Sequence, residues 1–422
     1  MATSTCEIAV IGGGIIGTSC ALYLREAGLD VALIERTDIA SGASRGNAGG
    51  LAFAEILPLA SPRIIRKALR WMRDPLGPLS LPPAYLPQIA PWLLRLWRAS
   101  WSDRYRANIQ SQVSLITLAQ SEMLGMMART GLDRHLYTQG MLEVYEGADR
   151  FAIAQEVVRE RARHGIESQP LQGTDLAAFQ PGLSPRFTHG IHIPNWRNID
   201  DPLKLTQDVA EHAFALGARL IRGDVSHLGP TAQGGRITLE DGSTIDARQI
   251  VIAAGAWSHH LTRQLGDAVP LETERGYNTT LPPDALDLHR QITFADHGFV
   301  VSPLTCGIRV GGAVELAGLK RAPDYRRSQA MLDKAKAFLP GLHTEGGQQW
   351  MGFRPSLPDS LPMISPASRH PAFIYAFGHG HLGLTQSAAT ARLVCDLATG
   401  RVPAIDLHPY RATRFSLFKD PR

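Results

Sequence analysis

The chain has 422 residues, of which 44% are hydrophobic and 19% charged, and its formal net charge at pH 7 is +4. This composition is typical of a globular enzyme with a sizeable core, which we expect to form two domains. The four cysteines show no C-x-x-C or metal-ligand spacing, and neither a leader nor a membrane-length apolar run is visible, so we predict no disulfide, no metal and a cytoplasmic location.

Residues 7–35 have the pattern of a dinucleotide-binding βαβ unit. The short β-branched run Ile8–Ile11, closed by glycines, predicts a strand buried on both faces of a parallel sheet. A helix over residues 15–27 follows and ends at Gly28, and residues 31–34 form the second strand.

The turn between this strand and the helix carries the G-x-G-x-x-G spacing as Gly12, Gly14 and Gly17. The first glycine permits the tight turn, the second lets a pyrophosphate approach the backbone, and the third lets the helix pack closely on the strand. Glu35, directly after the second strand, is placed to accept hydrogen bonds from ribose hydroxyls and to repel a 2′-phosphate. We therefore predict a dinucleotide other than NADP.

Two further segments favour FAD over NAD. Residues 36–53 are rich in glycine, serine and alanine where an NAD-binding chain would usually enter another helix, and their backbone amides can wrap a larger cofactor. Residues 377–394 form a second strand, glycine loop and helix, with the helix expected to begin near Thr385. A helix N-terminus there would stabilise the negative charge of reduced flavin.

Residues 63–106 combine nine Lys or Arg with two acidic residues and four of the seven tryptophans. Prolines interrupt this segment, so we expect short helices over residues 62–73 and 91–102. Tryptophan beside arginine suits a membrane interface, so residues 62–102 could contact the surface of a membrane. The alternative is that the tryptophans pack onto the protein while the arginines are solvated. No nucleic-acid-binding motif is present, so nucleic acid is not predicted as a partner.

The middle of the chain predicts elements that support the cofactor domain. Asp201 can cap and Pro202 can begin a helix that ends at Gly217. A strand over residues 218–228 follows, and then a hairpin that turns at residues 241–242.

With these segments the chain resembles the D-amino-acid oxidase superfamily of FAD-dependent oxidoreductases, most closely the bacterial D-amino-acid dehydrogenase branch, which includes hydroxy-D-proline dehydrogenase-like members. Six motifs carry the resemblance, in matching order along nearly the whole chain. They are the N-terminal glycine motif, S-x-x-S-x-x-N-A-G at 41–49, VIAAGAWS at 251–258, RGY at 275–277, WMGFRPSLPDSLPMI at 350–364 and GHGHLG at 378–383.

The resemblance implies a mixed α/β fold with a Rossmann-type FAD-binding domain and a discontinuous substrate domain built on an antiparallel sheet. It assigns residues 1–55, 200–262 and 345–422 to the FAD-binding domain, and residues 56–199 and 263–344 to the substrate domain. The FAD contacts expected from the glycine motif and from the resemblance are Gly12, Gly14, Ile15, Ile16, Gly17, Glu35, Arg36, Ser41, Ser44, Arg45, Asn47, Ala48, Gly49, Gly50, Val225, Ala253, Gly255, Trp257, Gly352, Gly380, His381, Leu382, Gly383, Leu384 and Thr385.

Removal of a hydride from the α-carbon of an amino acid needs mainly an oriented substrate, because the flavin supplies the redox chemistry. A guanidinium grips both oxygens of a carboxylate, and the resemblance gives this role to Arg354; the alternative is an ion pair with an acid such as Asp359. Tyr277 can donate its phenol to the same carboxylate, or to backbone. His379 can bond the flavin or the amine, or only satisfy backbone groups.

Three functions remain open. The first is oxidative deamination of a D-amino acid, D-proline and hydroxy-D-proline among the candidates, with electrons passed to a quinone or other acceptor by an enzyme that is cytoplasmic or peripheral on the inner face of the cell membrane. The second is an oxygen-using oxidase of glycine or sarcosine, although GHGHLG lacks the cysteine that links flavin covalently in some sarcosine oxidases. The third is a flavin-carrying subunit of a heteromeric dehydrogenase complex.

Overall fold

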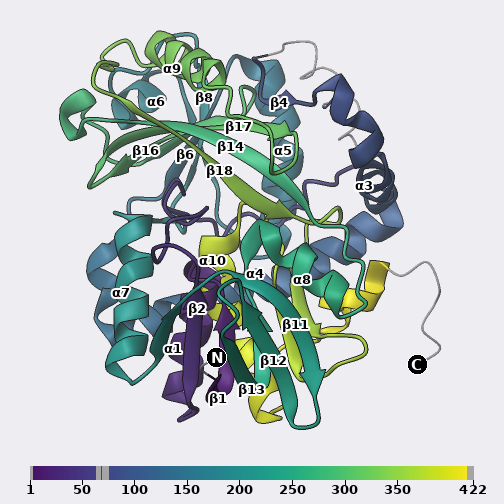
Figure 1. The fold of residues 1–422 in the computed structure, drawn as a ribbon. Coiled ribbons are helices and arrows are strands. Elements are labelled where there is room, and N and C mark those ends of the chain that lie inside the picture. Colours follow the sequence, from purple (N-terminus) through teal and green to yellow (C-terminus); the bar gives the residue numbers. More distant parts are fainter. Residues whose placement is uncertain (1–2, 63–67, 69–75, 416–422) are drawn as a thin grey trace.

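The computed structural model of the protein describes residues 3–62, 68 and 76–415. Two large sheets dominate the fold, one in the lower and one in the upper half of Figure 1, and helices pack on both. The mixed α/β class predicted from the sequence is confirmed.

The lower sheet has the strand order β10-β2-β1-β13-β12-β11, and β20 lies beside the end of β13 with β19 beyond it. The first strand pairs in parallel with β2 on one side and β13 on the other, and Ile8 and Val10 are fully buried, as predicted for a strand covered on both faces. The strands are β1 (Thr3–Ile11), β2 (Val31–Glu35), β10 (Arg219–Arg222), β11 (Val225–Thr231), β12 (Gly234–Leu239), β13 (Thr244–Ile252), β19 (Met363–Pro366) and β20 (Phe373–Phe377).

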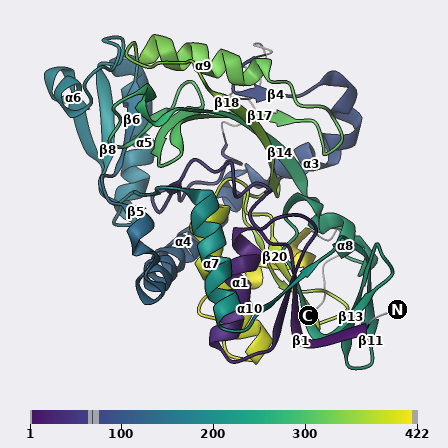
Figure 2. The same ribbon diagram turned by 60° about the vertical axis from the view of Figure 1, so that its left-hand side comes forward.

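Three helices lie together on one face of the lower sheet, with α1 in contact with both α7 and α10 (Figure 2). The Asp201 side chain caps α7 by accepting hydrogen bonds from the amides of Leu203 and Lys204, and Pro202 occupies the first turn, as predicted. The C-terminal helix begins at Gly383, two residues before the predicted start. These helices are α1 (Ile15–Glu26), α7 (Pro202–Ala215) and α10 (Gly383–Thr399), and α8 (Ser258–Gln264) packs near β11.

The upper sheet has the order β18-β14-β17-β16-β15-β6-β8-β7, with β4 beside β17. Most pairs are antiparallel, and β15 with β6 and β17 with β4 are parallel. Its strands are β4 (Leu79–Ser80), β6 (Met141–Tyr145), β7 (Gln169–Gln172), β8 (His189–Ile193), β14 (Glu272–Leu281), β15 (Gln291–Phe294), β16 (Phe299–Leu304), β17 (Gly307–Leu316) and β18 (Gln348–Ser356). Around it lie α3 (Leu86–Ala99), α5 (Ala148–Arg163), α6 (Gly173–Phe179) and α9 (Arg326–Phe338), the last along the top in Figure 1.

A third, small sheet joins the two halves. Its order is β3-β9-β5, formed by β3 (Gly50–Leu51), β9 (Arg197–Ile199) and β5 (Leu136–Tyr137). The short 3-10 helices are η1 (Pro83–Tyr85), η2 (Leu132–His135), η3 (Gly255–Trp257), η4 (Pro283–Ala285), η5 (His408–Tyr410) and η6 (Ala412–Phe415).

Two segments depart from the predicted division into domains. The strand β18, predicted within the FAD-binding domain, forms the edge of the upper sheet beside β14. The long helix α4 (Ser102–Thr130), predicted within the substrate domain, packs on α10, and its Met123, Met126 and Met127 belong to the buried cluster of the lower sheet. Hydrophobic periodicity marks a buried face but not the element that covers it, which explains both differences. The other domain ranges stay a prediction.

The strand predicted over residues 218–228 is two strands, because the chain bends at residues 223–224. The first part, β10, pairs in parallel with β2, and the second, β11, pairs antiparallel with β12. The hairpin turns at the predicted place, where Gly242 has φ +83°.

The helix predicted over residues 91–102 begins five residues earlier, at Leu86. Pro87 lies in its first turn, where a proline costs no hydrogen bond, and the helix ends at Ala99 before α4 begins. The helix predicted over residues 62–73 lies almost entirely outside the described residues. In the described part of the chain, no helix is both long and apolar enough to cross a membrane.

Candidate active site

A cavity of about 700 Å³ extends from the glycine turn after β1 to the strand β18 of the upper sheet. Its lining combines backbone and small residues from the lower half with polar and aromatic side chains from the upper half. The cavity therefore connects the predicted dinucleotide site with the predicted substrate site.

The glycine turn closes tightly, as its sequence predicts. Gly12 has φ +112°, and a Cβ at Gly17 would lie 1.8 Å from the Gly12 carbonyl oxygen, so the helix can approach the strand only because residue 17 is glycine. The Glu35 carboxylate accepts hydrogen bonds from the amides of Gly13 at 2.6 Å and Thr37 at 2.9 Å. This carboxylate thus stands at the turn where a ribose would be held.

The second glycine-rich segment packs against the first. The Ser44 hydroxyl accepts a hydrogen bond from the amide of Ile15 at 2.9 Å, at the N-terminus of α1. Across the cavity, the Arg36 guanidinium lies 4.0 Å from the centre of the Trp257 ring, and both residues line the wall together with Val225. Amides at a helix end suit phosphate, and the stacked pair suits a planar base, so these residues fit an FAD molecule.

Most of the predicted FAD contacts line this cavity. They are Gly12, Gly14, Ile15, Ile16, Glu35, Arg36, Ser41, Ser44, Asn47, Ala48, Gly50, Val225, Ala253, Gly255, Trp257, Gly380, His381, Gly383 and Leu384. Six others lie behind its wall, namely Gly17, Arg45, Gly49, Gly352, Leu382 and Thr385.

The residues behind the wall support it instead of lining it. The Thr385 hydroxyl accepts a hydrogen bond from the amide of Ala52 at 2.9 Å and so joins α10 to the chain after β3. Gly49 has φ +81°, and a Cβ there would lie 2.6 Å from the Ile199 carbonyl oxygen. Direct contact of such residues with the cofactor stays a prediction, because the motif spacing does not tell which side of a loop faces the cofactor.

At the substrate end, the side chains of β18 alternate, so that Trp350 and Arg354 face the cavity. A Cβ at Gly352 would lie 1.9 Å from the Trp350 ring, and a Cβ at Gly276 would lie 2.5 Å from the guanidinium carbon of Arg354. Two glycines on neighbouring strands therefore provide the space that the indole and the guanidinium occupy.

The Arg354 guanidinium is held without a carboxylate partner. Asp359, the alternative partner considered from the sequence, pairs with Arg414 at 2.7 Å. Among the described residues, no carboxylate oxygen lies within 4.0 Å of the Arg354 side chain, although Glu274 stands opposite it on β14. Burial lowers the pKa of Arg354, and Glu274 opposes that shift. The site thus presents a cation to the cavity.

Tyr277 lies along the cavity, but its phenol is already engaged with the protein. Its side chain is fully buried, donates a hydrogen bond to the Glu315 carboxylate at 2.6 Å and accepts one from the amide of Asp324 at 3.1 Å. Burial and Glu315 raise the pKa of Tyr277 to about 12. The phenol packs towards β17 and α9, and the predicted role of Tyr277 as a donor to the substrate carboxylate stays a prediction.

His379 is also turned inwards. Its Nε2 lies 2.9 Å from the Thr390 hydroxyl of α10, and only 3% of the residue is exposed. Burial lowers the pKa of His379 to about 3, so the ring is neutral. Its Nε2 is thus satisfied by a hydroxyl of the protein, whereas its Nδ1 is buried without a hydrogen-bond partner among the described residues, and the predicted role of His379 stays a prediction.

Arg309 is a residue of the cavity lining that the sequence did not reveal. Its guanidinium donates to the carbonyl oxygens of Arg45 and Asn47, and its Nε donates to the Thr280 hydroxyl at 3.0 Å. It therefore joins β17 to the second glycine-rich segment. No local pattern signals this role, because the acceptors lie more than 260 residues earlier.

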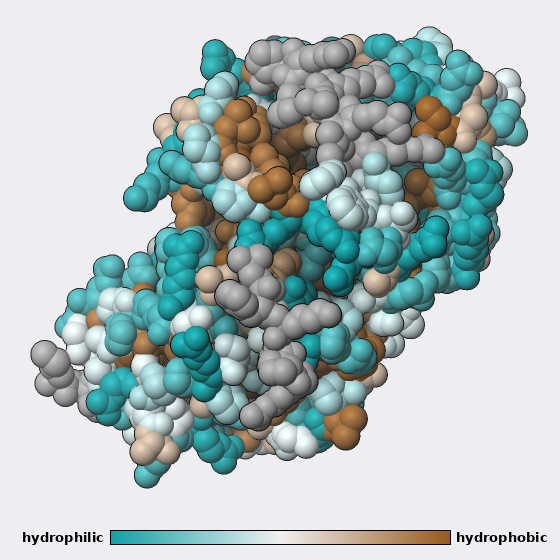
Figure 3. All heavy atoms as spheres, turned by 90° about the vertical axis from the view of Figure 1, so that its right-hand side faces the viewer, coloured by the Kyte–Doolittle hydropathy of each residue, from teal (hydrophilic) through white to brown (hydrophobic). Residues whose placement is uncertain are grey.

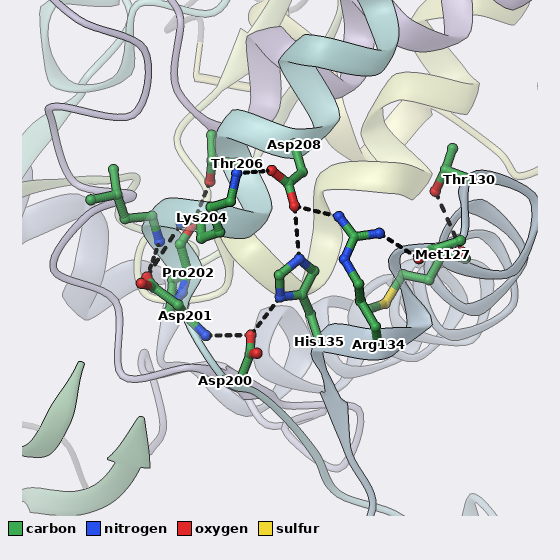
Figure 4. A network of polar contacts seen from close by, with 12 residues as sticks. Met127, Thr130, Arg134, His135, Asp200, Asp201, Pro202, Lys204, Thr206 and Asp208 are labelled. Atoms are coloured by element: carbon green, nitrogen blue, oxygen red, sulfur yellow. Dashed lines mark hydrogen bonds and ion pairs between the residues drawn. The ribbon is translucent and has the colours of Figure 1, made fainter. Parts of the chain in front are cut away.

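A polar network lies next to β9, the strand that pairs with Gly50 and Leu51 in the second glycine-rich segment (Figure 4). The His135 ring lies between two carboxylates, with Nδ1 2.7 Å from Asp200 and Nε2 2.9 Å from Asp208. Next to Asp200, the amide of Ile199 donates to the Gly49 carbonyl oxygen at 2.7 Å. The network thus holds β9 against the loop that lines the cavity.

The other side chains missed by the sequence reasoning lie at the upper end of the cavity. They are Glu143, Trp196, Asn278, Gln291 and Trp350. The alternation of β18 could have identified Trp350, since it lies four residues before Arg354 on the same face. The others come from separate strands of the upper sheet or from a turn, and only the fold brings them together.

Comparisons with known proteins agree with this geometry. The model of the FAD dependent oxidoreductase (DAO) family matches residues 7–397. A protein of Bradyrhizobium diazoefficiens named D-amino-acid oxidase is 32% identical over 416 residues, covering 97% of this chain and 99% of the relative. A D-amino acid dehydrogenase of Paramagnetospirillum magneticum is 32% identical over 428 residues, covering 98% of this chain and 99% of the relative.

The fold is similar to that of glycine oxidase from Geobacillus kaustophilus, with a TM-score of 0.75, 22% identity, and coverage of 97% of this chain and 99% of that chain. The predicted cofactor is therefore confirmed as FAD. The chain belongs to the DAO family of FAD dependent oxidoreductases.

Proposed function

We propose that this chain is a dehydrogenase that oxidises a D-amino acid to an imino acid, which hydrolyses to a 2-oxo acid, or to a cyclic imine when the substrate is D-proline or a hydroxy-D-proline. The observation that carries the proposal is the Arg354 guanidinium, which faces the cavity with no carboxylate partner among the described residues. A half-buried cation of this kind suits an anionic group of the substrate.

FAD, when bound, accepts the hydride from the substrate α-carbon. The chain's own residues orient the substrate and exclude water. Arg354 grips both carboxylate oxygens, and the Trp350 indole beside it forms an apolar wall for the substrate side chain. Gly352 and Gly276 leave the space in which both groups lie flat.

The preference for D-amino acids and the use of an acceptor other than oxygen rest on the relatives' names. Several relatives are named D-amino acid dehydrogenase, whereas the Bradyrhizobium relative is named D-amino-acid oxidase. That name supports a second candidate, an enzyme that passes its electrons directly to oxygen.

The test is anaerobic reduction of the bound flavin by D-amino acids, D-proline, hydroxy-D-prolines, their L-enantiomers and sarcosine. Reduction by D-acids alone is the expected result, and reduction only by sarcosine or L-acids would contradict it. Turnover in air without an added acceptor, with stoichiometric hydrogen peroxide, would favour the oxidase. Turnover by the isolated chain with a soluble dye would exclude dependence on a partner subunit.

We also propose that α3 contacts an anionic membrane surface, where the electron acceptor would be a quinone. Leu94, Trp97 and Trp101 are 63%, 46% and 45% exposed, and the Arg98 guanidinium lies 4.7 Å from the centre of the Trp101 ring. The face of the molecule that carries α3 has hydrophobic side chains gathered in its upper half (Figure 3). Exposed tryptophan beside arginine supports contact with lipid headgroups. Trp92, by contrast, is buried, as the packing alternative predicts.

A further inference from the structure

The two histidines of the GHGHLG loop have opposite environments. Both lie along the cavity, but His379 is buried and its Nε2 lies 2.9 Å from the Thr390 hydroxyl of α10, whereas the side chain of His381 is exposed. Among the described residues, none forms a hydrogen bond with the His381 ring. The loop therefore presents one exposed imidazole to the cavity, that of His381, which has no hydrogen-bond partner among the described residues.

The charged groups that face His381 come from two neighbouring strands of the upper sheet. Arg354 on β18 and Glu274 on β14 both shift the pKa of His381 through their charges. The third nearby titratable group, His379 of the same loop, is neutral. The ring is exposed towards the cavity, and the protein that lines this cavity withdraws it from bulk solvent. This desolvation lowers the pKa of His381, with Glu274 opposing and Arg354 adding to the shift. The ring is consequently neutral near pH 7 and can accept a proton.

The position beside Arg354 indicates which proton it accepts. An amino acid whose carboxylate is held by Arg354 has its ammonium group only two bonds beyond the carboxylate carbon. The ammonium must lose a proton before its nitrogen can stabilise the cation that hydride removal creates at the α-carbon. Glu274 is less suited to this step, because it accepts a hydrogen bond from the Ser356 hydroxyl at 2.8 Å and does not line the main cavity.

We propose that His381 is a catalytic residue that accepts this proton. The inference rests on the proposed function and deepens it. One N–H bond of the ammonium breaks, the proton moves to a ring nitrogen of His381, and the electron pair remains on the substrate nitrogen. The Cα–H bond then breaks with its electron pair leaving as hydride to the bound FAD, so that an iminium product and a protonated imidazole remain. The imidazolium returns its proton to solvent before the next turnover.

The test compares His381→Asn with His379→Asn, the same substitution two residues away in the same loop. For His381→Asn, we expect kcat/KM with a D-amino acid to fall about 100-fold at pH 7, the usual contribution of a general base. The loss should shrink as the pH approaches the pKa of the free substrate amine, because the substrate then arrives already deprotonated. Added imidazole should restore part of the activity of His381→Ala. His379→Asn should keep the wild-type shape of the pH profile.

Binding supplies a readout that does not depend on turnover. Propanoate has the carboxylate but no amine, so its dissociation constant, followed by perturbation of the flavin spectrum, should be unchanged in His381→Asn with a full complement of FAD. A loss of kcat/KM that stays constant from pH 7 to high pH, or no loss, would overturn the role of His381. Failure of wild-type flavin to be reduced by any D-amino acid would instead overturn the proposed function itself.

Discussion

The guanidinium of Arg354 lies flat against Gly276 on the neighbouring strand, so closely that a Cβ at Gly276 would be 2.5 Å from the guanidinium carbon. The anchor proposed for the substrate carboxylate is therefore positioned by the absence of a side chain. Gly276 lies in the RGY tripeptide, and its partner strand β18 carries Arg354 in register opposite Glu274.

The substitution Gly276→Ala tests this relationship. The added methyl forces the guanidinium to move, and we expect the KM for carboxylate substrates to rise roughly tenfold, equivalent to about 1.4 kcal/mol. The matched control is Gly125→Ala in α4, where the nearest atom to an added Cβ is Arg129 Nη1 at 3.9 Å. Equal KM values for the two variants would show that the position of Arg354 does not depend on Gly276.

Removal of the guanidinium should have a larger effect. For Arg354→Ala we expect a loss of about 3 to 5 kcal/mol in transition-state binding, because the substrate carboxylate would be left unpaired in a buried site. Arg354→Lys should be intermediate, since an ammonium cannot grip both oxygens. The measurement is kcat/KM for a D-amino acid and for the corresponding amine without a carboxylate. The amine should react equally with the wild type, Arg354→Ala and Arg354→Lys. An unchanged KM in Arg354→Ala with FAD bound would refute the anchor.

Glu35 should determine FAD affinity. Its carboxylate accepts hydrogen bonds from the Gly13 and Thr37 amides, and we expect Glu35→Gln to weaken FAD binding by roughly 10- to 100-fold, the effect of losing a charged acceptor. Flavin fluorescence on dilution measures the release. Glu7→Gln is the control, because Glu7 accepts a similar bond from the Asp30 amide at 2.8 Å outside the cavity. Equal release from both variants would argue against a cofactor role for Glu35.

His379 should destabilise the fold in acid. Its pKa is about 3 in the folded chain and about 6.5 when unfolded, so between these values the unfolded chain binds one more proton. The free energy of unfolding therefore falls by about 1.4 kcal/mol for each pH unit below 6.5 through this group alone. His379→Gln should show a correspondingly weaker pH dependence between pH 6.5 and 5 in denaturant unfolding. Parallel curves for the two proteins would mean that the ring is solvated.

The proposed membrane contact can be tested by sedimentation with vesicles. We expect the protein to bind vesicles of anionic phospholipid more than vesicles of phosphatidylcholine, and added salt to reduce binding. The double variant Trp97→Ser and Trp101→Ser should lose most of this binding, whereas Ile153→Ser, which removes an even more exposed side chain from α5, should retain it. Absence of vesicle binding by the wild type would support the alternative in which α3 faces only water.

The difference between the two histidines of GHGHLG shows where sequence reasoning stops. The motif places both rings in one loop, and their chemistry is identical. The direction of each side chain depends on α10, which offers the Thr390 hydroxyl to His379, and on the upper sheet, which surrounds His381 with Arg354 and Glu274. No local sequence pattern around the loop indicates which of these groups each ring will meet.

The sequence by itself determined the βαβ unit, because a glycine turn, a helix end and a terminal carboxylate recognise a dinucleotide within 30 consecutive residues. It also indicated FAD, through the glycine-rich residues 36–53 and 377–394, and the family, through six motifs in order along the chain. Tertiary structure alone decided that β18 joins the upper sheet, that α4 packs on α10, that the Tyr277 phenol donates to Glu315 and that Arg309 joins two distant segments. Those features depend on which buried faces meet, and a hydrophobic pattern specifies that a face is buried without specifying what buries it.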